Sequence, residues 1–202
     1  MSFTAKTAFE ARITNNSNDT LCNVAGKFRV STTDTDCSAG MLCVRNGKIP
    51  VDGISGTYNG TTVTVYNENT WYMNAATSSA DANDVIYACN TYDNQLVPGV
   101  GNNQYFIGRA TLGLGVPAGR YGNFTRINFD NESVYRFGEG NVTINTTGDT
   151  YFTIANGMLT SVTAKPSTAG EIYFELRETG KFVEGTNESF GYYDLVACKV
   201  AA

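Results

Sequence analysis

Apolar and polar residues alternate with a period of two along most of the chain, which is the pattern of half-buried β-strands. The segment 171–178 alternates most clearly, because Ile172, Phe174 and Leu176 share one face of the predicted strand. The same pattern predicts about a dozen short strands, over residues 8–13, 27–31, 41–46, 61–67, 84–90, 104–110, 124–129, 133–138, 141–146, 150–155, 159–164, 171–178 and 193–200.

Turn signals separate these segments. Three Asn-Gly dipeptides suit the positive φ of both central residues in a type I′ hairpin turn, and they are Asn46-Gly47, Asn59-Gly60 and Asn156-Gly157. The 21 glycines are spread along the chain, as expected for turns between short strands.

Residues 4–13 and 76–85 have some helical character. We expect an arm or a strand from the first, and a loop or short helical turn from the second.

Short strands with glycine-rich turns predict an all-β fold, either an antiparallel β-barrel or a β-sandwich. The 202 residues are sufficient for one large β domain or two small ones. A seam is predicted over residues 116–124, because four of the five cysteines and the longest loops precede it. Two organisations remain open. Either residues 1–122, including an N-terminal arm, and residues 123–202 form two β lobes, or the chain is one continuous unit.

The composition excludes several classes of function. Charged residues make up only 16% of the chain, the net charge is -5, and Lys and Arg form no run. We therefore expect no nucleic-acid binding through phosphate neutralisation and no adhesion to an anionic membrane. No apolar run approaches the length that spans a bilayer. The absence of histidine excludes Ser-His-Asp and Cys-His nucleophile systems and His-ligated zinc.

Five cysteines occur, at positions 22, 37, 43, 89 and 198, and none forms a C-x-x-C pair. This spacing does not support a zinc ribbon or a thioredoxin-type site. The first 12 residues lack the apolar core of a signal peptide. We therefore expect reduced cysteines in a protein made in the cytoplasm. The N-x-[ST] sequons follow from an Asn- and Thr-rich composition rather than from glycosylation.

One glycine motif requires a decision between two interpretations. Gly113, Gly115 and Ala118 satisfy G-x-G-x-x-[GA], and Glu132 follows at roughly the distance expected of a dinucleotide-binding site. Such a loop needs a helix after it, because the pyrophosphate binds at the helix N-terminus. Residues 117–122 contain one proline and two glycines, so no helix is expected there. We predict a tight connection between strands.

Acidic residues offer weaker candidates for chemistry. Asp34, Asp36 and Ser38 are spaced like the start of a calcium loop, but Ala39 and Arg45 occupy positions that an EF-hand gives to glycine and glutamate. We therefore expect a solvated loop. Paired carboxylates could form a glycosidase site, but the sequence does not show which of the 19 acidic residues meet. An enzyme that uses carboxylates alone ranks last among our hypotheses.

Aromatic residues provide the candidate interaction sites. Trp71, the only tryptophan, lies beside Tyr72 in a segment rich in Asn and Thr. One interpretation is a contact platform for sugar or protein. The other is a plug in the core or a cross-strand pair. The same alternatives apply to Phe190, Tyr192 and Tyr193.

Several segments resemble those of a known family in their general composition. These are "MSFTAKTAFEARI", "SAGMLCVRNG", "DVIYACN" and the Val-, Gly- and Ala-rich run "LVPGVGNNQYFIGRATLGLGVPAG". Over about its first 125 residues the chain resembles the decoration, or auxiliary head, proteins of tailed bacteriophages, although it contains no motif that is diagnostic of them.

The resemblance implies a β-barrel or β-tulip domain that docks on the major capsid protein at the virion surface. It also implies a homo-oligomer, often a trimer, whose N-terminal arm reaches a neighbour. We expect this arm, with Phe3 and Phe9, to order on the capsid. The resemblance implies no catalytic residue, metal or cofactor, so we predict that the protein is not an enzyme. The alternative is a carbohydrate-binding adhesin or a head-fibre or tail module, with Trp71 and Tyr72 as the contact residues.

Overall fold

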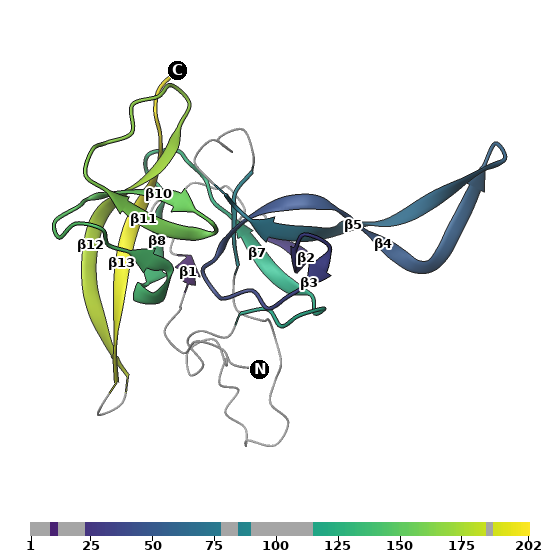
Figure 1. The fold of residues 1–202 in the computed structure, drawn as a ribbon, viewed down its shortest axis with the longest axis horizontal. Helices are drawn as coiled ribbons and strands as arrows, with labels where there is room; N and C mark the ends of the chain where they lie inside the picture. Colours follow the sequence, from purple (N-terminus) through teal and green to yellow (C-terminus); the bar gives the residue numbers. More distant parts are fainter. Residues whose placement is uncertain (1–8, 12–22, 78–84, 90–114, 185–187) are drawn as a thin grey trace.

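The computed structural model describes residues 9–11, 23–77, 85–89, 115–184 and 188–202 (Figure 1). Regular structure in these residues is β-strand apart from one 3-10 turn, so the predicted all-β class is confirmed. The elements are β1 (Phe9–Ala11), β2 (Asn23–Val30), β3 (Thr33–Asp34), β4 (Leu42–Tyr58), β5 (Thr61–Ala75), β6 (Tyr87–Cys89), β7 (Gly122–Arg126), β8 (Val134–Gly138), η2 (Glu139–Asn141), β9 (Val142–Thr143), β10 (Tyr151–Ala155), β11 (Met158–Val162), β12 (Ile172–Glu184) and β13 (Glu188–Lys199). Within the described residues, no helix has the length and apolar character that crossing a membrane requires.

Five strands close into a barrel. β2 pairs in parallel with β5 and antiparallel with β7, and the pairs β5–β4, β4–β6 and β6–β7 complete the ring. β3 is added to β2 outside this ring. Where the five strands pair, each has a neighbour on both sides. The ring therefore lacks the open sheet edges that favour aggregation.

The barrel interior is tightly packed. Val24 and Phe28 point inward from β2, and Gly26 lies between them. A Cβ atom at Gly26 would lie 2.7 Å from Cγ of Met73 and 2.9 Å from the carbonyl oxygen of Trp71, so glycine allows β5 to approach β2 closely. The buried residues of the barrel core are Val24, Phe28, Cys37, Cys43, Met73, Tyr87, Cys89, Val116 and Phe124.

The second sheet has seven strands in the order β1-β8-β13-β12-β10-β11-β9. Its centre has the alternation predicted from the sequence, because Ile172 and Phe174 of β12 are buried and Leu176 packs beside them. The rings of Phe137 and Phe174 meet edge to face, with centroids 5.6 Å apart. β1 forms one edge of this sheet by pairing with β8.

The sheet packs against the outside of the barrel through a shared core. Leu42 of β4 and Ala88 of β6 belong to the same buried cluster as Phe137, Phe152 and Phe174 of the sheet. The backbone amide of Leu42 also donates a hydrogen bond to the carbonyl of Gly157, at 2.8 Å. Gly122, where the first of the two suggested lobes ends, is the first residue of β7, which pairs with β2 and β6 in the barrel.

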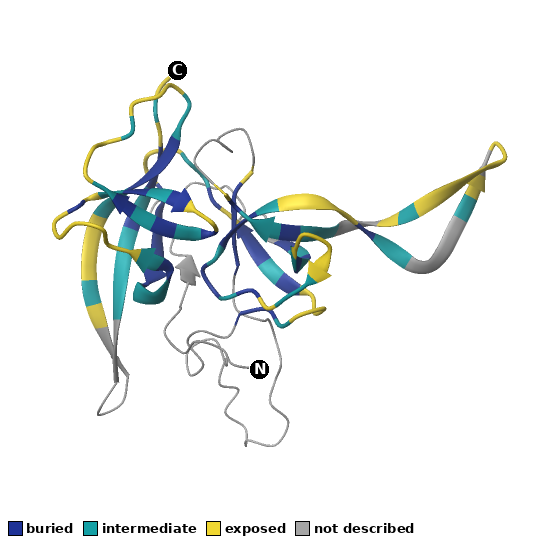
Figure 2. Cartoon of the chain, in the orientation of Figure 1, coloured by how far each residue is buried: buried dark blue, intermediate teal, exposed yellow. Residues whose placement is uncertain are grey.

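Two long hairpins extend beyond this packed centre. In Figure 1 the hairpin of β4 and β5 projects to one side, and that of β12 and β13 projects on the other. β4 pairs with β6 only at Leu42 and Cys43, and β5 pairs with β2 only at residues 70–73. The remainder of the β4–β5 hairpin is a two-stranded ribbon, which we call the arm (residues 51–66). Figure 2 shows that its tip is exposed.

Two of the three predicted Asn-Gly hairpin turns are confirmed. Asn59-Gly60 joins β4 to β5, and Asn156-Gly157 joins β10 to β11, with positive φ at all four residues. The prediction for Asn46-Gly47 is wrong, because this dipeptide lies inside β4. There the pairing shifts between Arg45 and Lys48, so the dipeptide forms a β-bulge with Gly47 at φ +86°.

Candidate functional site

The two aromatic candidates lie at the base of the arm, where β5 enters the barrel. Trp71 and Tyr72 are neighbours on a strand, so they point to opposite faces. Trp71 lies on the face of Met73 and packs against the barrel core, whereas Tyr72 lies on the outer face. Both side chains are half-buried. The buried part of the Trp71 side chain therefore fits its interpretation as a core residue.

A bulge places two cations over the Trp71 ring. Arg45 pairs with Met73 and Lys48 pairs with Trp71, so two residues of β4 lie opposite one of β5. The bulge thus returns Lys48 to the face that Arg45 occupies. The Arg45 guanidinium lies 4.5 Å from the centroid of the Trp71 ring and 4.9 Å from that of Tyr87, and the Lys48 ammonium lies 5.5 Å from that of Trp71. These are cation–π distances.

Tyr72 makes a similar contact on the outer face. The Arg29 guanidinium lies 3.3 Å from the Tyr72 ring centroid, and its Nε donates to Oδ1 of Asp34 at 2.5 Å. Beside this pair, the Lys27 ammonium lies 4.6 Å from the Tyr121 ring centroid. The barrel therefore carries basic side chains stacked on aromatic rings, although the chain as a whole is acidic. Sequence reasoning singled out the aromatic residues and missed the cations that cover them.

The arm is the second part of the candidate site. Val63 has 39% of its surface exposed and Tyr66 has 49%, and the threonines at 61, 62 and 64 are exposed as well. No charged residue occurs from Gly53 to Asn67. The sequence predicted a strand over 61–67, but not that this part of the strand lies outside both cores. The one available signal was the β-branched run itself, which no turn residue or charge interrupts.

The other two predicted interaction residues are Phe3 and Phe9. Phe3 lies outside the described residues. Phe9 belongs to β1, and its backbone pairs with Phe137 at the edge of the seven-stranded sheet. Phe9 therefore belongs to a different sheet from Trp71 and Tyr72.

The described part of the glycine motif begins at Gly115 and leads into β7. Val116 forms a two-way backbone bridge with Cys37, with N···O distances of 2.8 and 2.7 Å. A turn with Gly119 at φ +72° follows, and then β7, with no helix. Gly113 lies outside the described residues. The dinucleotide interpretation fails because no helix N-terminus stands where the pyrophosphate would need one.

The acidic loop beside this bridge has a structural role. Asp34 forms an ion pair with Arg29, and Oδ1 of Asp36 accepts a hydrogen bond from the amide of Ala118 at 2.8 Å. The described residues contain no group of three or more His, Cys, Asp or Glu side chains that could hold a metal ion. The loop fastens β3 and the 115–120 connection to the barrel.

Four of the five cysteines lie in the described residues, and all four are buried thiols outside any disulfide. Cys37, Cys43 and Cys89 belong to the barrel core. Burial raises the pKa of the Cys37 thiol well above its ordinary value, and the neighbouring Cys43 and Cys89 raise it further. Burial also raises the pKa of Cys43. Because the thiolate is the reactive form, these residues act as small apolar core residues.

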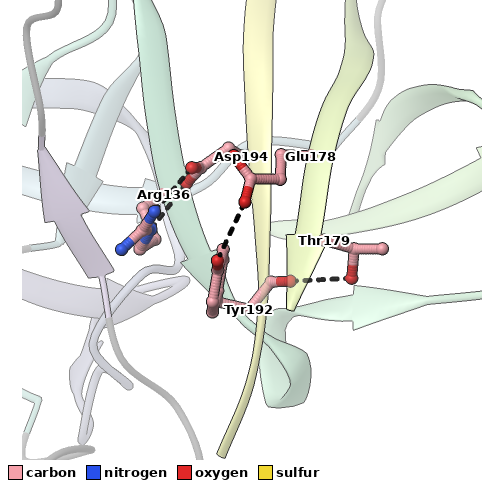
Figure 3. A network of polar contacts seen from close by, with 5 residues as sticks. All are labelled: Arg136, Glu178, Thr179, Tyr192 and Asp194. Carbon is pink, nitrogen blue, oxygen red and sulfur yellow. Dashed lines mark hydrogen bonds and ion pairs between the residues drawn. The ribbon is translucent and has the colours of Figure 1, made fainter. Parts of the chain in front are cut away.

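A polar network crosses the base of the second hairpin (Figure 3). Arg136 of β8 is 9% exposed and donates two hydrogen bonds of 2.6 Å to the carboxylate of Asp194 on β13. Its guanidinium also lies 4.0 Å from the Tyr192 ring centroid. The Tyr192 hydroxyl donates to Glu178 at 3.3 Å, and Thr179 donates to the Tyr192 carbonyl at 2.9 Å. The network fixes β8, β13 and β12 side by side.

Comparisons with known proteins give no assignment. No protein-family model, no curated protein and no solved structure matches the chain.

Proposed function

We propose that the protein is a structural component of a phage virion, which binds the outer surface of the capsid and contacts the major capsid protein as an oligomer. The observation that carries this proposal is the arm. A two-stranded ribbon is marginally stable by itself in water, and Val63 and Tyr66 of the arm are exposed on a segment that supports neither core. A surface of this kind favours a role in contact with other proteins.

The chemistry of the remaining molecule supports the same proposal. The described residues hold no cluster of metal ligands, and the chain has no histidine. Burial keeps Cys37 and Cys43 of the barrel core in the unreactive thiol form. The resemblance to decoration proteins implies the capsid as the binding partner and a trimer as the assembly, and both remain predictions.

Capsid binding can be tested by co-sedimentation. The purified protein would be mixed with phage heads that lack it, and compared with a variant in which an Asn-Gly turn replaces residues 51–65. We expect the wild type to sediment with the heads and the shortened variant to lose most of its binding. Because the arm lies outside both cores, the variant should keep the urea denaturation midpoint of the wild type.

A matched control separates the arm from surface changes in general. Ile144 is 40% exposed on the seven-stranded side of the molecule, and Ile144→Ser should leave binding to the heads unchanged. If wild type and shortened variant both remain in the supernatant, the capsid proposal is wrong. Equal sedimentation of the two would show that the arm is not the contact.

The carbohydrate-binding alternative lacks a supporting observation in the described residues. A sugar would need an open face of Trp71 on which to stack, and Arg45 and Lys48 lie over this ring.

A further inference from the structure

The arm presents two strand edges that differ in chemistry. Beyond residues 70–73, where β2 covers it, the outer edge of β5 has no pairing among the described residues. The outer edge of β4 is likewise uncovered beyond Leu42 and Cys43, where it meets β6. Each edge exposes a row of backbone donors and acceptors, which is a template for another strand.

Only one of these edges carries the residues that prevent strand addition. β4 contains Lys48, Pro50, Gly53 and Gly56, and charge, proline and glycine are the means by which proteins blunt an edge. In β5 the run Thr-Thr-Val-Thr-Val-Tyr (61–66) contains no charge, proline or glycine. Such a run has high β-propensity and low charge, so it pairs with another strand when it is exposed. The β5 edge is therefore the open one.

The turn at the tip shows which groups this edge offers. Asn59 has φ 47° and Gly60 has φ 77°, as in a type I′ turn. In this turn the amide of Thr61 points toward Tyr58 of β4. Amides alternate in direction along a strand, so those of Thr62, Thr64 and Tyr66 point to the open edge.

We propose that the β5 edge of the arm pairs antiparallel with the same edge of a second copy of this chain, around a two-fold axis at Thr64. Thr62 of one copy then faces Tyr66 of the other, and both have outward amides. Val63 faces Val65 in the closely spaced, non-hydrogen-bonded position, where side chains approach best. The pattern is thus complementary to itself, which is the requirement of a two-fold interface.

Charge allows this contact. The arm is uncharged from Gly53 to Asn67, so two arms meet without repulsion although each chain carries a net charge of -5. The inference deepens the proposed function by naming a partner of the arm. It rests on the role of the arm as a contact surface, but its test uses the purified protein without capsids, so the two proposals can fail separately.

Two proline variants test which edge pairs. Thr62 and Thr57 are cross-strand partners, both exposed, with amides that point to opposite edges. Proline removes one outward donor in either variant and leaves the β4–β5 ladder in place. By sedimentation equilibrium, Thr62→Pro should weaken dimer formation at least about tenfold, and Thr57→Pro should leave it unchanged. A monomeric wild type, or a loss of dimer in Thr57→Pro alone, would overturn the proposal.

A crosslinking experiment does not depend on how proline affects the arm. Thr64 faces itself across the two-fold axis, with Cα atoms about 5.5 Å apart, which is within the range of a disulfide. In a Cys22→Ser background, Thr64→Cys should form a covalent dimer on oxidation with copper phenanthroline, and Thr57→Cys should not. Equal crosslinking of the two variants, or none in either, contradicts the proposed register.

Discussion

Among the described glycines, Gly115 has the least room for a side chain. A Cβ atom there would lie 1.5 Å from the carbonyl oxygen of Cys37 and 2.5 Å from its carbonyl carbon. Neither atom can move without breaking the bridge between Cys37 and Val116. We expect Gly115→Ala to reduce the free energy of unfolding by about 3 kcal/mol or more, measured by urea denaturation.

Gly56→Ala is the control for this substitution. The nearest atom to a Cβ at Gly56 is Cγ2 of Val63, at 3.2 Å, which belongs to an exposed side chain of the arm. This variant should change the free energy of unfolding by less than about 0.5 kcal/mol. Equal stability of Gly115→Ala and wild type would show that the connection rearranges freely.

At the scale of elements, the existence of strands was predictable and their lengths were not. Local alternation identified the segment 171–178, and β12 extends from Ile172 to Glu184. The dipeptide Asn46-Gly47 predicted a turn for the same local reason as Asn59-Gly60. Whether an Asn-Gly pair closes a hairpin or forms a bulge depends on the strand that lies opposite, and β5 continues past Asn46-Gly47. This information is not local.

The contacts of Trp71 and Tyr72 illustrate the same limit for the candidate site. Both aromatic residues were identifiable from the sequence, because they are large and lie in a polar segment. The cationic side chains of Arg45 and Lys48 come from β4, and the bulge places both of them over the Trp71 ring. A sequence shows which residues carry charge, but cross-strand register decides which of them meet.

The ion pair of Arg136 and Asp194 links β8 to β13, and its side chains are 11% and 13% exposed. Asp194→Asn would remove the carboxylate that accepts both guanidinium hydrogen bonds. Loss of one partner of a largely buried pair destabilises a protein strongly. We expect the free energy of unfolding to fall by about 2–4 kcal/mol in this variant, measured by urea denaturation.

A double variant separates the ion pair from packing. Replacing both partners, in Arg136→Met with Asp194→Leu, removes the buried charge together with its counter-charge, and should recover part of the stability lost in Asp194→Asn. If the single variant is as stable as wild type, the network of Figure 3 does not hold these strands together.

At the scale of the whole molecule, the shared core makes the barrel and the sheet depend on one another. Leu42 of β4 is fully buried in the same cluster as Phe152 and Leu195 of the sheet. No local pattern reveals this contact, since Leu42 and Leu195 are brought together only when both sheets have formed. The sequence therefore left one unit or two lobes open.

Unfolding with two probes tests this dependence. Trp71 fluorescence reports on the barrel alone, because Trp71 is the only tryptophan, whereas far-UV circular dichroism reports on both sheets. If the shared core couples them, the two urea transitions coincide. Leu42→Ala should shift both together and lower the free energy of unfolding by about 2–5 kcal/mol, while Val63→Ala in the exposed arm should shift neither. Separate transitions, with Leu42→Ala moving only the fluorescence, would mean that barrel and sheet unfold as independent lobes.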